Sequence, residues 1–277
     1  MGVRTDLALE EQELRQAEGT ALSGVRCRER QEQGIRITEV EILDAAGAEA
    51  LHKPRGRYVT LEPDAEQIRC SPSLCADVLA ATLAALLPPE GPFLVVGLGN
   101  RAVTPDAIGP LALRQVLATR HLRSALPELF GGFREVSTIP TGVLGDTGLE
   151  SAEIVESLVR KTKPRCVLAI DALASARPER LCSSIQVTDA GIAPGSGVHN
   201  DRRALCRDSL GVPVLGIGVP TVCDLRSLID TEAEMIVTPG KIDAQVSDLA
   251  RILGAAVNQA LHPKIPPEDL AEFVGSV

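Results

Sequence analysis

Apolar runs alternate with amphipathic stretches along most of the chain. Leucine, valine and alanine recur at helical spacing over residues 71–87 and predict a helix that stops at Pro88-Pro89. The next run, FLVVGL (93–98), is apolar throughout, which is typical of a strand buried on both faces of a parallel sheet. Further strands are predicted at 133–139, 166–173, 184–189 and 213–219.

Helical patterns fill the intervals between these strands. The stretch DAIGPLALRQVLATRHL (106–122) predicts one helix, and SAEIVESLVRKTK (151–163) predicts another, with Ser151 as its N-cap and basic residues in its last turns. A long amphipathic helix is expected from about Lys241. The alternation indicates an α/β fold, a mostly parallel twisted sheet with helices on both faces.

The N-terminal region is charge-rich and less clearly patterned. A strand pair is plausible at 34–42 and 56–62, which predicts an N-terminal β elaboration over about residues 7–70. No repeat and no clear linker interrupts the pattern, so a single domain is expected.

Composition narrows the classes of ligand. The formal net charge of -9 argues against direct binding of nucleic acid, because phosphate contacts need a cationic face. The longest apolar stretch, ADVLAATLAALLPP, is too short to span a membrane, and the acidic N-terminus does not resemble a signal peptide.

The seven cysteines are scattered without a CxxC pair, and the four histidines lack the spacing of a zinc site. We therefore expect a cytoplasmic protein with buried free thiols and neither cofactor nor metal.

Candidate chemistry gathers where the predicted strands end, which is where open α/β sheets place their sites. Strand 93–98 leads into GLGNRAVTPDAIGP, and strand 166–170 leads directly to Asp171. Strand 213–219 leads into VPTVCD, and the loop DAGIAPGSGVHN (189–200) lies between the last two strands.

The first of these loops has two interpretations. Gly97, Gly99 and Ala102 fit the dinucleotide motif G-x-G-x-x-A, but Pro105 implies that the loop continues where that motif requires a helix. Pro105 suits a first helical turn and would place Asp106 where free N–H groups favour a carboxylate. The loop is therefore expected to hold an acid rather than a phosphate.

Asp106 and Asp171 form the candidate catalytic pair. Each has a structural alternative, Asp106 as support for a helix start and Asp171 as a solvated acid at a strand end. Two carboxylates at one sheet edge can share a proton, so that one activates water while the other polarises a carbonyl group. This chemistry is aspartyl-type peptide hydrolysis.

Two other motifs are set aside. Asp146-Thr147-Gly148 spells the DTG of pepsin-like proteases, but it occurs once and in an α/β chain, so it is interpreted as a turn. Ser196 in PGSGVHN fits a serine-hydrolase elbow only loosely, since no strand–elbow–helix surrounds it.

Several long motifs together resemble one family. VVGLGNRAVTPDAIGP, AIDALASAR, VTDAGIAPGSGVHN and LGVPVLGIGVPTV, in this order, are similar to the germination proteases of spore-forming bacteria, as is RTDLALE near the start. The resemblance covers nearly the whole chain. It implies an atypical aspartic endopeptidase of α/β fold, related to the hydrogenase-maturation peptidases, that degrades small acid-soluble spore proteins during germination.

The resemblance also implies roles for particular residues. The catalytic aspartates fall on Asp106 and Asp171. Support of the site falls on two loops, through Gly97, Gly99, Asn100, Gly195, Ser196 and Gly197. His199 stands where the family usually has glycine.

Assembly and processing are implied in the same way. Members are zymogens that cut themselves, which here predicts a propeptide of residues 1–6, a cut between Asp6 and Leu7, and a peptidase domain over 7–277. A homotetramer is implied, located in the forespore or spore core, with no membrane and no direct nucleic-acid partner.

Two alternatives belong to other functional classes. A processing peptidase of the hydrogenase-maturation kind would need His or Glu ligands for nickel beside the site, and no convincing set is found. A non-catalytic, nucleotide-binding α/β protein would be indifferent to substitution of Asp106 and Asp171.

Overall fold

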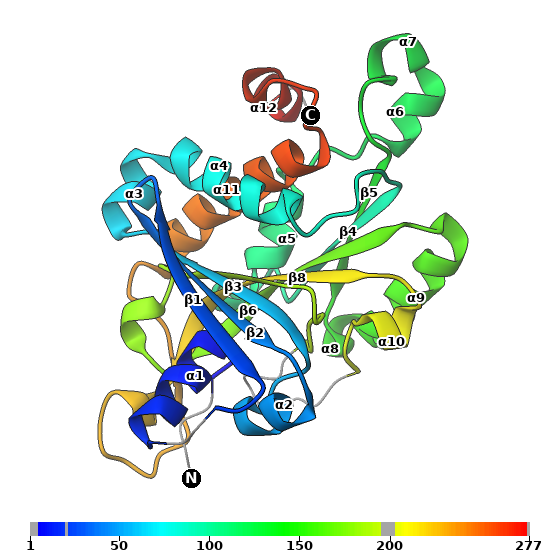
Figure 1. The fold of residues 1–277 in the computed structure, drawn as a ribbon. Coiled ribbons are helices and arrows are strands. Elements are labelled where there is room, and N and C mark those ends of the chain that lie inside the picture. Colours follow the sequence, from blue (N-terminus) through cyan, green and yellow to red (C-terminus); the bar gives the residue numbers. More distant parts are fainter. Residues whose placement is uncertain (1–4, 20–21, 195–202, 276–277) are drawn as a thin grey trace.

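A computed structural model describes residues 5–19, 22–194 and 203–275 (Figure 1). In these ranges one sheet runs through the molecule in the order β1-β2-β3-β7-β8-β6-β4-β5, with β9 paired to β8. The strands are β1 (Val25–Glu32), β2 (Ile35–Ile42), β3 (Gly56–Glu62), β4 (Phe93–Leu98), β5 (Val136–Gly142), β6 (Cys166–Ser175), β7 (Ile185–Thr188), β8 (Val214–Asp224) and β9 (Ile236–Val237).

The α/β class is confirmed, but the sheet is mixed rather than mostly parallel. Strands β5, β4, β6 and β8 are parallel, whereas β7, β3, β2 and β1 continue the sheet by antiparallel pairing. The connection from β6 to β7 spans only residues 176–184, and a parallel crossover needs about a dozen residues or more. The expected N-terminal strands 34–42 and 56–62 are present as β2 and β3, and they form much of the antiparallel half.

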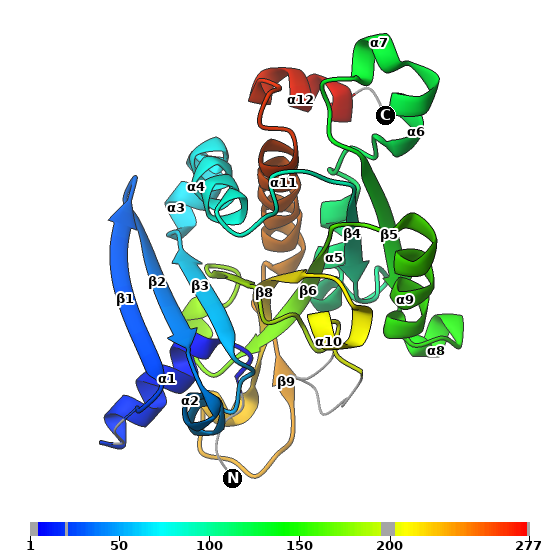
Figure 2. The same ribbon diagram turned by 45° about the vertical axis from the view of Figure 1, so that its right-hand side comes forward.

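Helices cover both faces of the sheet (Figure 2). On one face α4, α5 and α11 pack on a large core, and on the other α9 and α10 pack on β4 and β6. The helices are α1 (Ala8–Ala17), α2 (Ala45–Leu51), α3 (Ala65–Cys70), α4 (Pro72–Ala84), α5 (Ile108–Leu113), α6 (Arg120–Ala125), α7 (Pro127–Phe130), α8 (Leu144–Thr147), α9 (Ser151–Thr162), α10 (Arg207–Leu210), α11 (Ile242–Leu261) and α12 (Pro267–Gly275), with short 3-10 turns η1 (Thr104–Asp106), η2 (Pro178–Arg180) and η4 (Leu225–Ser227).

The single helix expected over 106–122 is wrong. The chain forms η1, α5 and α6, with an irregular stretch between the last two. Thr119 pairs with β5 instead, because its N–H donates to the Val136 carbonyl (3.0 Å) and its hydroxyl oxygen accepts from the Val136 N–H (3.0 Å). The side chain of Asn258 accepts from the Leu117 N–H (2.9 Å). Tertiary hydrogen bonds therefore take the backbone groups that a longer helix would use.

Two smaller expectations also change. The N-cap of α9 is Glu150 rather than Ser151, and Glu150 forms a capping box with Glu153. All seven cysteines are free, but Cys27 and Cys70 are exposed rather than buried. Among the described residues, no helix combines the length and the hydrophobicity that crossing a membrane requires.

His262 gives the fold a predicted pH dependence. The side chain is 1% exposed, its Nδ1 accepts from the Arg134 N–H (3.2 Å), and burial together with the Arg134 charge lowers its pKa to about 4. The folded state therefore keeps His262 neutral, while the unfolded chain takes up a proton below about pH 6.5. Stability from this residue is complete above pH 6.5 and is lost as the pH falls toward 4.

The measurement compares urea unfolding of the wild type and His262→Gln at pH 7.5 and pH 5. The wild type should lose about 2 kcal/mol more than the variant over this interval, at about 1.36 kcal/mol for each pH unit between 6.5 and 5. Glutamine retains an acceptor for the Arg134 N–H without titrating. Equal losses in the two proteins would contradict the prediction.

Candidate active site

The loop after β4 is folded back on Asp106. The Asn100 N–H donates to Asp106 Oδ2 (2.7 Å), so the amide that a phosphate would need is engaged by a carboxylate. Gly99 has a φ of 106°, and a Cβ there would overlap the Asp106 carbonyl oxygen. Glycine is thus required for the backbone to turn this closely around the acid. These contacts favour the interpretation that the loop positions the Asp106 carboxylate rather than binding a phosphate.

A pair of glycines, Gly97 and Gly109, brings α5 against the sheet. A Cβ at Gly97 would come within 2.7 Å of the Gly109 carbonyl oxygen, and one at Gly109 within 2.5 Å of the Ile170 carbonyl oxygen. The start of α5 can therefore lie directly on β4 and β6. Thr221 of β8 also donates to the Pro105 carbonyl oxygen (2.6 Å), which ties η1 to the next strand.

Asp171 lies within β6 rather than after its end. Strand β6 continues to Ser175 because β8 offers a parallel partner along its whole length, with Asp171 opposite Gly218. The carboxyl is 4% exposed, and its Oδ1 accepts from the Ala172 N–H (2.9 Å). The expectation of a strand-end acid is wrong in position, and the side chain is more buried than a solvated strand end would be.

The two aspartates line one cavity of about 510 Å³. Asp106 reaches it from η1 and is half-buried, and Asp171 reaches it from the neighbouring strand β6. Its wall also contains Gly99 and Asn100, predicted from the sequence as site-loop residues, and Asp6, predicted as part of the cleavage junction. The other lining residues were not predicted, namely Val103, Pro105, Gly142, Val143, Gly145, Ser151, Ala172, Leu173, Ala174, Pro194, Thr221, Val222 and Ile236. Two carboxylates in one recess can perform acid–base chemistry on a bound peptide.

Comparison with known proteins decides the family. A family model described as Germination protease matches residues 3–234. The chain belongs to the germination protease family. It is 38% identical to the Germination protease of Caldanaerobacter subterraneus subsp. tengcongensis over 321 aligned residues, covering 99% of this chain and 98% of the relative. The corresponding protein of Bacillus cytotoxicus is 44% identical over 245 residues, with coverage of 84% and 66%.

The resemblance stated from the motifs is therefore confirmed, and the chain is a peptidase that acts on protein substrates. Among solved structures, the [NiFe] hydrogenase maturation protease HycI from Thermococcus kodakarensis KOD1 is similar at 17% identity and a TM-score of 0.39, covering 64% of this chain and 98% of that one.

The remaining predicted residues fall in different places. Gly195, Ser196 and Gly197 lie outside the described residues, as does His199, although Pro194 just before them lines the cavity. Asp146 is exposed and lies with Thr147 in α8, and Gly148 ends that helix in a left-handed conformation, so the DTG sequence forms the C-terminal end of a short helix.

Among the lining residues that were not predicted, Thr221 could have been found from the sequence. It follows the apolar run 213–219, at the sheet edge where sites are expected. Ile236 could not have been found from the sequence, because β9 reaches the cavity only by pairing with the end of β8.

The segment around Asp6 docks beside the same cavity. The Asp6 N–H donates to the Ala174 carbonyl (2.9 Å), and the Ala174 N–H donates to Asp6 Oδ2 (2.8 Å). Gln186 holds the following residues, because its Oε1 accepts from the Ala8 N–H (2.8 Å) and its Nε2 donates to the Asp6 carbonyl (3.3 Å). Leu7 is fully buried. The predicted cleavage junction between Asp6 and Leu7 therefore lies at one wall of the cavity.

Gly99→Ala is expected to impair both folding and cleavage. Alanine is strained at this φ and would displace Asp106, at a cost of about 2–3 kcal/mol of stability. A displaced carboxylate should lower cleavage by about 100-fold. Gly145→Ala is the matched control, since Gly145 lines the same cavity and an added Cβ there meets nothing within 4 Å. Assays at 15 °C, where both proteins are folded, check the second effect; equal activity of the two variants would contradict it.

Proposed function

We propose that this protein is an aspartic endopeptidase that uses Asp106 and Asp171 as a pair. The observation that supports this most directly is the single cavity lined by both carboxyl groups, one on η1 in the loop after β4 and the other on the adjacent parallel strand β6. The glycine turn at Gly99 and the Asn100 N–H hold one acid, and the extended pairing of β6 with β8 holds the other. Rigid strands on both sides suit a site that must keep two carboxyl groups at a fixed distance and orientation.

The proposed reaction needs one ionised and one protonated carboxyl group. The ionised group takes a proton from water, and the resulting hydroxide attacks the peptide carbonyl carbon. The protonated group donates a hydrogen bond to the carbonyl oxygen as negative charge develops there. When the tetrahedral intermediate collapses, the C–N bond breaks and the proton taken from water passes to the leaving nitrogen. Asp106 and Asp171 are the groups proposed for these two roles.

The family resemblance extends the proposal to substrates and processing. The substrates are small acid-soluble spore proteins, degraded during germination in the spore core. The chain is a zymogen that removes residues 1–6 by cutting between Asp6 and Leu7, and it works as a homotetramer. The docking of Asp6 in the wall of the cavity supports a link between this junction and the site.

The test incubates the purified chain with a small acid-soluble spore protein and follows the fragments by mass spectrometry. Discrete fragments are expected, and the enzyme itself should acquire an N-terminus at Leu7. Light scattering of the same sample should give the mass of four chains. Absence of fragments would overturn the proposed substrate, and a new N-terminus at another residue would overturn the proposed processing site.

A nucleotide-binding function receives no support from the same loop. Gly99 lies against the Asp106 carboxylate, and the Asn100 N–H donates to the same group. Within the described ranges, no group of three or more His, Cys, Asp or Glu residues is placed to hold a metal ion.

A further inference from the structure

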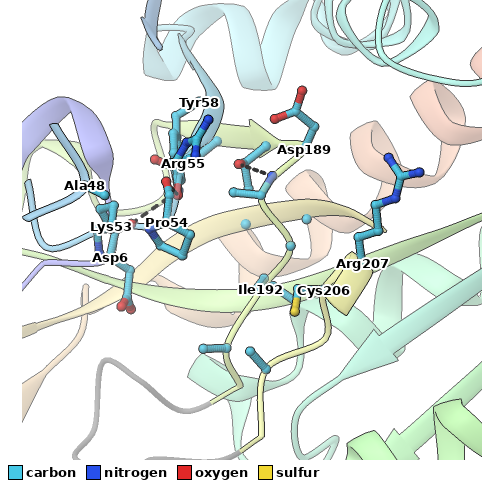
Figure 3. A pocket seen from close by; sticks show the side chains of 18 of the residues that line it. Asp6, Ala48, Lys53, Pro54, Arg55, Tyr58, Asp189, Ile192, Cys206 and Arg207 are labelled. Atoms are coloured by element: carbon cyan, nitrogen blue, oxygen red, sulfur yellow. Dashed lines mark hydrogen bonds between the residues drawn. The ribbon is translucent and has the colours of Figure 1, made fainter. Parts of the chain in front are cut away.

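Strand β8 lines two cavities. Gly216 and Gly218 line the larger one, which has a volume of about 830 Å³ and lies between the segment before β3 and α10 (Figure 3). Neither Asp106 nor Asp171 lines that cavity. Three residues beyond Gly218, Thr221 lines the smaller cavity that contains both aspartates. Strand β8 therefore contributes to the candidate active site through its C-terminal end.

A β-bulge falls at this end of the strand. In the pairing of β6 with β8, Leu173 lies opposite Pro220 and Ala174 lies opposite Val222. Thr221 is thus the extra residue of the bulge, without a counterpart in β6. Bulges are rare between parallel strands, and beside active sites they redirect a side chain. The sheet gives up one regular pair here and gains a side chain aimed away from the ladder.

The hydroxyl of Thr221 binds the peptide unit that joins Pro105 to Asp106. The Thr221 side chain is buried, and its Oγ1 donates to the Pro105 carbonyl oxygen (2.6 Å). On the other side of the same peptide unit, the Asp106 N–H donates to the Val103 carbonyl oxygen (2.8 Å). Because a peptide unit is planar, these two hydrogen bonds fix its orientation and the point from which the Asp106 side chain extends. Thr221 is itself held, since its carbonyl oxygen accepts from Thr238 Oγ1 (2.7 Å).

The turn η1 needs such an anchor. It is three residues long, its N-cap Val103 makes no side-chain cap hydrogen bond, and Pro105 has no N–H to donate. A second anchor is exposed, the hydrogen bond from Thr104 Oγ1 to Asp243 Oδ1 at the start of α11 (2.9 Å). Water competes for an exposed hydrogen bond, so the buried Thr221 hydroxyl is the firmer of the two anchors.

We propose that Thr221 is a positioning residue for peptide cleavage, because its hydroxyl holds the backbone of η1 so that the Asp106 carboxyl group is directed into the cavity it shares with Asp171. This inference rests on the function proposed above. The Asn100 N–H holds one oxygen of the carboxylate, whereas Thr221 sets the position of the backbone behind it. A displacement of about 1 Å at a reacting group can cost about 100-fold in rate, so loss of this hydroxyl should be visible in kcat.

The first experiment replaces Thr221 by valine, which removes the hydroxyl and keeps the shape of the side chain. Initial rates of cleavage of a small acid-soluble spore protein by the full chain, over a range of substrate concentrations, separate kcat from KM. Thr221→Val should lower kcat by about 10- to 100-fold and change KM by less than about 3-fold. Thr221→Ser keeps the hydroxyl, and its kcat should stay within about 3-fold of the wild type.

Thr119→Val is the matched control. Thr119 is equally buried and donates to a backbone carbonyl oxygen at the same distance, that of Arg134 (2.6 Å), but it lines neither cavity. Its Oγ1 also accepts from the Val136 N–H, so Thr119→Val should lower the urea midpoint at least as much as Thr221→Val while leaving kcat unchanged. If the two valine variants have equal kcat, or if Thr221→Ser is as slow as Thr221→Val, the inference is wrong.

The Asp106→Asn background tests whether Thr221 acts through Asp106. Thr221→Val should lower the residual rate of that variant by less than about 2-fold, because the carboxylate that it positions is already absent. A loss as large as in the wild-type background would overturn the inference and leave the aspartate pair intact, whereas wild-type activity of Asp106→Asn would overturn both. If Thr221→Val does not fold at 15 °C, Thr221→Ala replaces it, and Thr221→Ser must then exceed Thr221→Ala in kcat by about 10-fold or more.

Discussion

Asp106→Asn and Asp171→Asn are each expected to lower cleavage of a small acid-soluble spore protein by about 10²–10⁴-fold, the usual contribution of a general acid or base. Asparagine keeps the size of the side chain but can neither take a proton from water nor pass one to the leaving nitrogen. In the proposed mechanism the two groups act as a unit, so the double variant should be little worse than either single variant. Initial rates of fragment formation measure the effect.

Asp146→Asn is the control for this experiment. Asp146 is an exposed acid on α8, and its neighbours Val143 and Gly145 line the cavity that contains Asp106 and Asp171, while Asp146 itself does not. It should retain the wild-type rate. Circular dichroism and the urea midpoint should show that all variants are folded. Cleavage that survives substitution of both Asp106 and Asp171 would refute the pair, whatever the outcome for Asp146.

The parallel half of the sheet could be predicted from the sequence for a simple reason. A strand covered on both faces must be apolar at every position, and β4 is buried along its whole length. Asp171 was recognisable because it interrupts such a run in β6. Where β6 ends was not recognisable, because its last residues are strand only through pairing with the end of β8.

The N-terminal region was harder to predict because its contacts are distant in sequence. Strand β1 is polar and mostly exposed, so its pairing with β2 leaves no apolar pattern. Helix α1 is anchored by the side chains of Glu10 and Glu13, which bind residues more than 100 positions away. The cavity lined by Asp106 and Asp171 combines loops and strands from seven separate parts of the chain, and two of them, residues 142–151 and Ile236, were not identified as site residues from the sequence.

The anchor of α1 is a buried ion-pair cluster centred on Arg180. The Arg180 side chain is 6% exposed and pairs with both oxygens of Glu13 (2.8 Å each), with Glu62 (3.0 Å) and with Glu10 (3.4 Å). Burial alone would lower the pKa of Arg180, but its hydrogen bonds to Glu13 and Glu62 raise it above the ordinary value. Glu10 is 1% exposed and also accepts from the Ala176 N–H (2.6 Å). The cluster joins α1 to β3 and to the chain beyond β6.

Arg180→Met is expected to destabilise the protein by about 3–5 kcal/mol, because it leaves the buried carboxylate of Glu10 without its cation. Methionine has a similar length and avoids a large cavity. The urea midpoint at pH 7.5 measures the effect. Arg177→Met is the control: Arg177 also pairs with Glu13 (3.0 Å), but its side chain is 51% exposed, so its loss should cost less than about 1 kcal/mol.

The same substitution should act on processing through the N-terminal segment. Thr5, Leu7 and Ala8 are buried around the half-buried Asp6, so the junction must open locally before any active site can reach it. Cleavage that depends on such an opening follows the population of the open state. Arg180→Met loosens the anchor that begins three residues after Leu7, and it should therefore acquire the N-terminus at Leu7 faster than Arg177→Met under conditions where both are folded. Equal rates would show that the cluster stabilises the fold without holding the junction closed.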